Sequence, residues 1–325
     1  MKSIVRWGIL GTGKIAGTFA EELPFSQTGR LVAVASRTAG GAREFAARFG
    51  GVRAHGDYPS LLADPEVDAV YISTPHPFHA EWACAAARAG KHILCEKPLA
   101  MTHAEASAMV DEARRAGVFL MEAFMYKCHP RTTRIADLVR SGAVGRARMI
   151  EASFSFAAAF DPAKRLFNKE LGGGGILDVG CYTMSVARMV AGAASGKPFE
   201  NPSRVLGATV QTSTGVDSFA AATLEFSDGL LAQIFCGIGL TKGHDLVVFG
   251  EEGRIRAPYF MSPPGEIEIH RGDNVTVEPA SGSTHKYALE ADAVAQALPG
   301  LESPHMSWAD SLGNAAALDA WREAS

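Results

Sequence analysis

The sequence predicts an α/β protein of two domains, in which a doubly wound parallel sheet is followed by an α+β domain with a predominantly antiparallel, open sheet. The chain has 325 residues, about twice the usual domain length of ~150 residues. Up to about residue 124, short runs rich in Val and Ile alternate with segments of helical period, as in βαβ units. Beyond that point, alternating strands are separated by turns, which is typical of antiparallel sheets.

We expect the parallel sheet and its helices within residues 1–123. The predicted strands are 4–10, 31–36, 69–73, 92–95 and 118–122, and the predicted helices are 14–23, 42–49, 77–89 and 103–116. In such a sheet the strands end at one common edge, and ligands bind beyond that edge. Motifs that directly follow these strands are therefore the first places to look for a site.

The second predicted domain comprises residues 124–325. It begins with a helix over 130–140. The strands that follow are 148–156, 205–212, 219–226, 230–236, 246–250, 254–257, 266–270 and 274–277. A final amphipathic helix near 307–322 is expected to pack back on the first domain.

Composition and charge exclude several classes of protein. Lys and Arg number 31 against 35 Asp and Glu, and no basic block is present, so neither nucleic acid nor an anionic membrane is an expected partner. The apolar stretches are far shorter than the ~20 residues that cross a bilayer. A charge interrupts the apolar run near the N-terminus before a secretory segment develops, so we expect a cytoplasmic protein. The five cysteines contain no C-x-x-C pair, which argues against disulfides and structural zinc.

A glycine motif directly follows the first strand and opens the first helix. It reads Gly11-Thr12-Gly13-Lys14-Ile15-Ala16. Gly11 permits a tight turn, Gly13 lets the backbone approach a pyrophosphate, and Ala16 replaces the third glycine of a Rossmann-type fingerprint. The start of the helix then presents amide groups to phosphates. An ordinary glycine turn is the alternative, and the motif alone does not distinguish a nicotinamide from a flavin nucleotide.

The end of the second strand favours NADP over NAD. Ser36 and Arg37 stand where an NAD-preferring fold usually carries an acidic residue for the ribose hydroxyls. An arginine suits the 2′-phosphate of NADP instead. NADP is therefore the expected cofactor and NAD the second choice, with a plain surface role for Arg37 as the alternative.

Three further motifs follow in order along the chain. They are Thr74-Pro75-His76-Pro77-Phe78-His79, Cys95-Glu96-Lys97-Pro98-Leu99-Ala100, and the glycine-rich segment from Gly172 to Gly175 that continues through Asp178 to Tyr182. With the first glycine motif, they closely resemble the glucose-fructose oxidoreductase, inositol dehydrogenase and rhizopine-catabolism (Gfo/Idh/MocA) family over essentially the whole chain. Residues 121–126 and Tyr182 are most similar to the branch of dimeric dihydrodiol dehydrogenases and D-xylose dehydrogenases, since many other relatives have histidine in place of Tyr182.

The resemblance and the chemistry of alcohol oxidation point to the same residues. Lys97 lies at a strand end and, by the resemblance, is followed by a cis peptide bond and takes part in catalysis. Oxidation of an alcohol removes a hydroxyl proton while the hydride leaves, and Tyr182 is the candidate proton acceptor because a nearby lysine lowers the pKa of a phenol. If the glycine-rich segment opens a helix, Asp178 shares a face with Tyr182 and can hold Lys97 or a substrate hydroxyl. A packed core tyrosine and a helix-capping aspartate are the alternatives.

Other residues complete the predicted site. We expect Thr74, Pro75, His76, His79 and Glu96 to line the cofactor crevice together with Lys97. Phe124, Tyr126 and Arg165 are the predicted substrate contacts, in addition to Lys97, Asp178 and Tyr182. A metal site at His76 and His79 is not expected, because cysteine ligands at suitable spacing are lacking.

These observations predict an NAD(P)-dependent oxidoreductase that acts on the hydroxyl of an aldose or related cyclic polyol. The alternatives are a trans-dihydrodiol dehydrogenase, a non-enzymatic regulator that senses dinucleotides on the same fold, and an enzyme that recycles one bound cofactor between two sugars. The open second sheet would leave an apolar patch in water, so we expect a homodimer or homotetramer formed through it.

Overall fold

The chain, in a computed structural model that describes residues 4–325, divides into two compact units. The first consists of Met1–Cys128 with His285–Leu312, and the second of His129–Thr284 with Gly313–Ser325. The predicted terminal helix is α9 (Trp308–Glu323), whose residues up to Leu312 belong to the first unit and whose remainder belongs to the second. The binding roles assigned to the two domains stay predictions.

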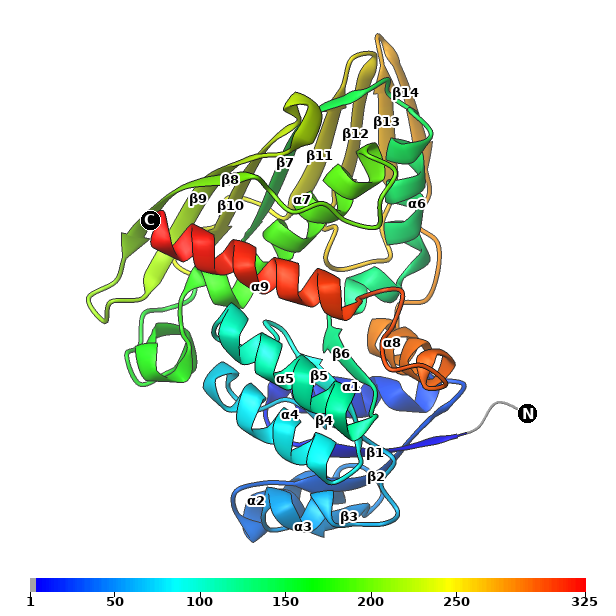
Figure 1. The fold of residues 1–325 in the computed structure, drawn as a ribbon, viewed down its shortest axis with the longest axis vertical. Coiled ribbons are helices and arrows are strands. Elements are labelled where there is room, and N and C mark those ends of the chain that lie inside the picture. Colours follow the sequence, from blue (N-terminus) through cyan, green and yellow to red (C-terminus); the bar gives the residue numbers. More distant parts are fainter. Residues whose placement is uncertain (1–3) are drawn as a thin grey trace. The chain divides into compact units, whose positions relative to one another are not determined.

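The first unit contains a doubly wound parallel sheet, as predicted (Figure 1). Six parallel strands lie in the order β3-β2-β1-β4-β5-β6. They are β1 (Val5–Leu10), β2 (Gly29–Ala35), β3 (Arg53–His55), β4 (Ala69–Ile72), β5 (His92–Glu96) and β6 (Leu120–Ala123). The helices are α1 (Lys14–Glu22), α2 (Ala39–Ala47), α3 (Tyr58–Leu62), α4 (His79–Arg88), α5 (His103–Ala116) and α8 (Lys286–Ala297). Three elements were not predicted from the sequence: β3 and α3, which are short, and α8, which follows the strands of the other unit.

The core of the first unit forms around its central strands. Every residue of β4 is buried, because helices cover both faces of a parallel sheet. The ring of Phe19 on α1 stacks on Tyr71 with ring centroids 4.0 Å apart, and it meets Trp7 of β1 edge-on at 5.4 Å. These contacts fix α1 on the sheet directly after the glycine turn.

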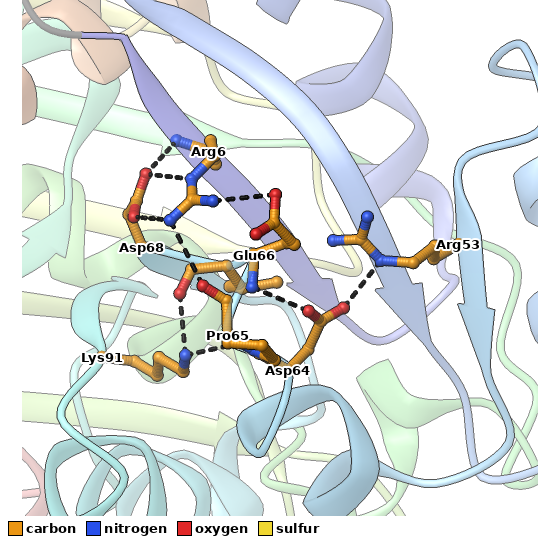
Figure 2. Close-up of polar contacts among 8 residues, drawn as sticks. Arg6, Arg53, Asp64, Pro65, Glu66, Asp68 and Lys91 are labelled. Carbon is orange, nitrogen blue, oxygen red and sulfur yellow. Dashed lines mark hydrogen bonds and ion pairs between the residues drawn. The ribbon is translucent and has the colours of Figure 1, made fainter.

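A network of polar contacts joins the amino ends of these strands (Figure 2). Arg6 of β1 binds both carboxylate oxygens of Asp68, with Nε–Oδ2 at 2.9 Å and Nη2–Oδ1 at 2.7 Å. The Lys91 Nζ atom is buried and donates to the backbone carbonyls of Asp64 and Val67 at 2.7 and 2.8 Å. The network thus ties the segments that lead into β4 and β5 to the start of β1.

The second unit contains an eight-stranded, predominantly antiparallel open sheet, as predicted (Figure 1). Its order is β14-β13-β12-β11-β7-β10-β9-β8, and the pair β7–β10 is parallel. The strands are β7 (Ala147–Ser155), β8 (Arg204–Gln211), β9 (Asp217–Glu225), β10 (Leu231–Gly237), β11 (Asp245–Gly250), β12 (Gly253–Pro258), β13 (Ile267–Arg271) and β14 (Asn274–Glu278).

One face of this second sheet is covered by helices. α7 (Cys181–Ala194) packs on β7 and β10, and α6 (Pro130–Arg140) packs on α7. Along β10 the side chains alternate between buried and exposed, because successive residues of a strand point to opposite faces. Within residues 4–325, no helix combines the length and the apolar character needed to span a membrane.

Candidate active site

The glycine turn after β1 has the geometry that a dinucleotide requires. Gly11 has a φ of +107°, and a Cβ atom there would lie 3.0 Å from the Ser73 hydroxyl oxygen, so only glycine fits. A Cβ atom on Gly13 would meet nothing within 4 Å, so space is open beside it. No side chain caps α1, which leaves the amide groups at its start, from Lys14 onward, available to phosphate oxygens. The buried Ala16 keeps the helix close to the sheet.

The residues after β2 lie beside this turn. The hydroxyl oxygens of Thr12 and Ser36 are 3.3 Å apart. Arg37 is exposed, and Thr38 caps α2 by accepting a hydrogen bond from the Gly41 amide at 3.2 Å. The position suits contact with the ribose end of a dinucleotide, and a cationic side chain stands there in place of an acidic one.

The loop after β4 combines an unpartnered hydroxyl with two histidines. Among the described residues, Thr74 Oγ1 is buried and has no hydrogen-bond partner, which fits a polar ligand arriving at this edge. Pro75 is half-buried, and the buried ring of His76 lies 5.6 Å from that of His79. His79 is wholly buried, and both of its ring nitrogens lie 2.9 Å from backbone carbonyls, those of Pro98 and Thr74. The structure thus gives its nitrogens backbone partners, whereas the sequence analysis expected a cofactor contact.

Lys97 follows β5 at the same edge of the sheet. Its backbone amide donates to Glu96 Oε2 at 3.2 Å, and its peptide bond to Pro98 is cis, as the family resemblance implies. The Glu96 carboxylate is buried and accepts a hydrogen bond from the Tyr71 hydroxyl. Lys97 is half-buried, and the residues on either side of it, Glu96 and Pro98, are buried.

The predicted substrate residue Asp178 lies on a π-helical turn of the second unit. This turn, η6 (Ile176–Gly180), precedes α7, where the sequence predicted an α-helical start as one possibility. Asp178 Oδ1 is 2.5 Å from Arg165 Nη2. The N-cap of α7 is Gly180 and no side chain caps the helix, so Asp178 is not its cap. Two predicted substrate residues are therefore paired with each other.

Tyr182 lies in the first turn of α7 and its side chain is packed. It is 5% exposed, and its ring meets Phe154 of β7 edge-on with centroids 5.4 Å apart. Phe154 in turn contacts the ring of His244 at 5.0 Å. The aromatic packing sets the orientation of the Tyr182 ring, and the role of its hydroxyl in proton transfer stays a prediction.

Asp217, which was not predicted from the sequence, supports the glycine-rich segment. Its Oδ2 atom accepts a hydrogen bond from the Ile176 amide at 2.6 Å. Gly174 has a φ of +112°, and a Cβ atom there would collide with the Asp217 carboxylate. Burial raises the pKa of Asp217 to about 6, although the Ile176 amide acts to lower it. No motif marks this residue, because it comes from the start of β9, far along the chain.

The remaining predicted substrate contacts lie in the packed interior of the first unit. Phe124 and Tyr126 are each 1% exposed and meet edge-on with ring centroids 6.0 Å apart. The neighbouring Lys127 is buried and forms an ion pair with Asp310. Their contribution to substrate binding stays a prediction.

Within residues 4–325, no three or more His, Cys, Asp or Glu side chains lie close enough together to hold a metal ion.

Two family models match the chain. The first, described as an oxidoreductase family with an NAD-binding Rossmann fold, covers residues 5–124. The second, described as the GFO/IDH/MocA C-terminal domain, covers residues 132–256. Between them they include the glycine turn, Lys97 and the π-helical turn.

Characterised relatives match over most of their length. The chain is 37% identical to trans-1,2-dihydrobenzene-1,2-diol dehydrogenase from Danio rerio, over 82% of this chain and 78% of the relative. It is 35% identical to D-xylose 1-dehydrogenase (NADP(+)) 2 from Haloferax volcanii, over 97% of this chain and 95% of the relative. The solved structure of KijD10, a 3-ketoreductase from Actinomadura kijaniata in complex with NADP and TDP-benzene, aligns with a TM-score of 0.88 at 30% identity, covering 99% of this chain and 98% of that one.

Proposed function

The chain belongs to the Gfo/Idh/MocA family of NAD(P)-dependent oxidoreductases, and from this premise we propose that it transfers a hydride between the nicotinamide of NADP and a hydroxyl-bearing carbon of an aldose or cyclic polyol. One observation carries the proposal. Lys97 directly follows β5 at the same sheet edge as the open glycine turn after β1, and the unpartnered Thr74 hydroxyl lies in the loop after β4, the strand between them.

The choice of substrate class follows from relatives and from the polar groups of the second unit. One relative is named for D-xylose with NADP(+), and another for a trans-diol. The Asp178 carboxylate and the Arg165 guanidinium, paired at 2.5 Å, offer an acceptor and donors suited to neighbouring hydroxyl groups. A trans-dihydrodiol dehydrogenase is the second candidate, favoured by the 37% identity to that enzyme.

In the proposed mechanism, side chains of the protein transfer the proton and the cofactor transfers the hydride. When bound, the nicotinamide supplies or accepts the hydride. In oxidation, the Tyr182 phenolate, whose negative charge the Lys97 ammonium stabilises, takes the proton of the substrate hydroxyl and becomes the neutral phenol as the hydride leaves. The amides at the start of α1 hold the pyrophosphate, while Ser36 and Arg37 hold the 2′-phosphate.

A substrate panel tests this function. Aldoses, cyclic polyols and trans-dihydrodiols are offered with NADP⁺ and with NAD⁺, and reduced nicotinamide is followed by absorbance. Turnover of a sugar with NADP⁺ is expected. Turnover of dihydrodiols alone would establish the second candidate, and turnover of none of the three classes would overturn the proposal.

Tyr182→Phe tests the proton route separately. The ring and its contact with Phe154 are kept and only the hydroxyl is lost, so the protein should stay folded while kcat falls by ~10²–10⁴-fold. Retention of kcat with a change in stability alone would leave Tyr182 as a core residue.

We also propose that a second copy of the chain covers the open face of the eight-stranded sheet. Leu206, Val210 and Leu231 on this face are 41–49% exposed. An open hollow of about 710 Å³, lined by residues of β7, β8, β9, β10 and β11, includes Leu206 in its wall. Apolar groups gathered on one face indicate an interaction surface.

Leu231→Asp should therefore dissociate the oligomer, measured by light scattering after size-exclusion chromatography. Ile4→Asp, which changes an exposed apolar residue outside this sheet, is the matched control and should leave the mass unchanged. A monomeric wild-type protein would refute this interface.

A further inference from the structure

One peptide group, the one that joins Pro98 to Leu99, is held at both of its polar atoms. His79 Nδ1 lies 2.9 Å from the Pro98 carbonyl oxygen, and the Leu99 amide donates to Glu122 Oε1 at 2.8 Å. The two side chains come from the start of α4 and from β6, and both are almost wholly buried, with His79 at 0% and Glu122 at 2% exposure.

We infer that His79 and Glu122 are positioning residues for Lys97, whose own peptide bond to Pro98 comes one residue before this peptide group. They act by fixing the backbone from which the Lys97 side chain projects, and they touch neither substrate nor cofactor. The inference rests on the proposed function, in which Lys97 stabilises charge during proton transfer.

The two residue types match the two ends of the peptide group. A carbonyl oxygen needs a donor and an amide needs an acceptor, and in a site closed to water an unpaired group of either kind is costly. His79 must carry a proton on Nδ1 to serve Pro98. Its other nitrogen lies 2.9 Å from the Thr74 carbonyl and donates there only when the ring carries both protons. Burial lowers the pKa of His79, although the backbone hydrogen bonds act to raise it, and so favours the neutral ring with a single donor.

Glu122 can accept the hydrogen bond from the Leu99 amide whether its carboxyl group is charged or neutral. The charged and titratable groups around it are Asp310 and Lys127, with Cys95 on the neighbouring strand and His305 beside Lys127. The Ser311 side chain also lies close to the carboxyl group. Burial raises the pKa of Glu122 to about 7, but Oε1 can accept from Leu99 in both forms, since the proton can reside on Oε2. The uncharged amide of a glutamine should therefore accept the same hydrogen bond in place of this carboxyl group.

The first experiment compares Glu122→Ala with Glu122→Gln. The alanine variant should lose ~10–100-fold in kcat, because small displacements of a reacting group cost this much, while the dissociation constant of NADPH, measured by fluorescence without turnover, changes less than about threefold. The glutamine variant should keep kcat within about threefold. Glu112→Ala is the matched control, because it removes a buried carboxylate on α5 that pairs with Arg88 and Arg115, and it should leave kcat unchanged.

The second experiment compares His79→Asn with His79→Gln. The asparagine amide nitrogen can take the place of Nδ1 and so keep the donor to Pro98, whereas the glutamine amide nitrogen takes the place of Nε2, near the Thr74 carbonyl, and leaves Pro98 without a donor. His79→Asn should therefore retain more kcat than His79→Gln. Equal or reversed values would overturn the role of His79 at Pro98.

Lys97→Met separates failure of this inference from failure of the proposed function. If Lys97→Met keeps its kcat, the proposed function fails and this inference fails with it. If Lys97→Met loses kcat but Glu122→Ala does not, only the positioning role is overturned. Equal loss of kcat and NADPH binding in Glu122→Ala, or a glutamine variant as poor as the alanine one, would show a general structural role and overturn the inference. If Glu122→Ala does not fold, the comparison of kcat between His79→Asn and His79→Gln tests the inference in its place.

Discussion

At the amino edge of the first sheet, Arg6 is hydrogen-bonded to Asp68, and Lys91 is hydrogen-bonded to two backbone carbonyls (Figure 2). At the carboxyl edge, by contrast, Gly13 faces open space and the Thr74 hydroxyl has no partner among the described residues. Both edges belong to the same parallel strands. One is closed by the protein's own polar groups, and the other is left incomplete in a way that a ligand can complete.

The direction of the chain explains the difference. In a βαβ unit each helix starts at the carboxyl edge, so unpaired amides and the positive ends of helix dipoles gather there. The amino edge receives the helix ends and the return loops, where fixed partners stabilise the fold. We therefore expect substitutions at the carboxyl edge to change catalysis and cofactor choice, and those at the amino edge to change stability.

The largest effect is expected at Lys97. Lys97→Met removes the ammonium but keeps much of the aliphatic chain, so kcat should fall by ~10²–10⁴-fold while NADP still binds and the melting temperature is little changed. Steady-state kinetics and a thermal melt measure this. Turnover within a few-fold of wild type would remove Lys97 from proton handling and would weaken the contrast between the edges.

Arg37 should affect cofactor choice and little else. Each charge-assisted hydrogen bond to the 2′-phosphate contributes ~1.5–3 kcal/mol, so Arg37→Ala should raise KM for NADP by roughly 10–150-fold and leave KM for NAD nearly unchanged. Arg37→Asp should go further, because a carboxylate repels the phosphate and can accept from ribose hydroxyls. The ratio of kcat/KM for the two cofactors is the measured quantity. An unmoved ratio would make Arg37 a solvated surface residue.

Glu122 should make stability depend on pH at the carboxyl edge. Its pKa is about 7 in the folded protein and 4.5 as an ordinary value, so the folded state holds the proton between these values and the free energy of unfolding falls as pH rises through them. Glu122→Gln imitates the protonated form, and its stability relative to wild type should rise by at most about 3 kcal/mol from about pH 5 to about pH 8. Denaturant titrations at both pH values measure this difference, and a constant difference would contradict it.

The smallest effect is expected at the amino edge. Asp68→Asn weakens a pair whose side chains are about one-third exposed, so it should cost about 1 kcal/mol of stability and leave kcat and both KM values unchanged. Burial acts to raise the pKa of Asp68, but hydrogen bonds from Arg6 outweigh it and hold the pKa below its ordinary value. The contribution is thus present at neutral pH and is lost as the pH falls below about 4. A change in kcat would break the proposed contrast.

Local patterns in the sequence were sufficient for much of the fold. Helix α6 has the predicted bounds, Pro130–Arg140, because its apolar period, the proline at its start and the glycine after its end are all local signals. The alternating strands of the second sheet and the glycine turn at Gly11 were predicted for the same reason. The short strand β3 (Arg53–His55) was missed, since three residues are too few to show a period.

The sequence by itself determined which residues stand at the strand ends, because motif and strand are neighbours along the chain. Only the tertiary structure decided which groups interact. His79 lies at the carbonyls of Pro98 and Thr74, Glu122 accepts from the Leu99 amide, and Arg165 pairs with Asp178. A hydrogen bond depends on positions and directions that segments distant in sequence acquire only when they pack together. For that reason the chain shows which side chains can do chemistry, while the fold determines which of them meet.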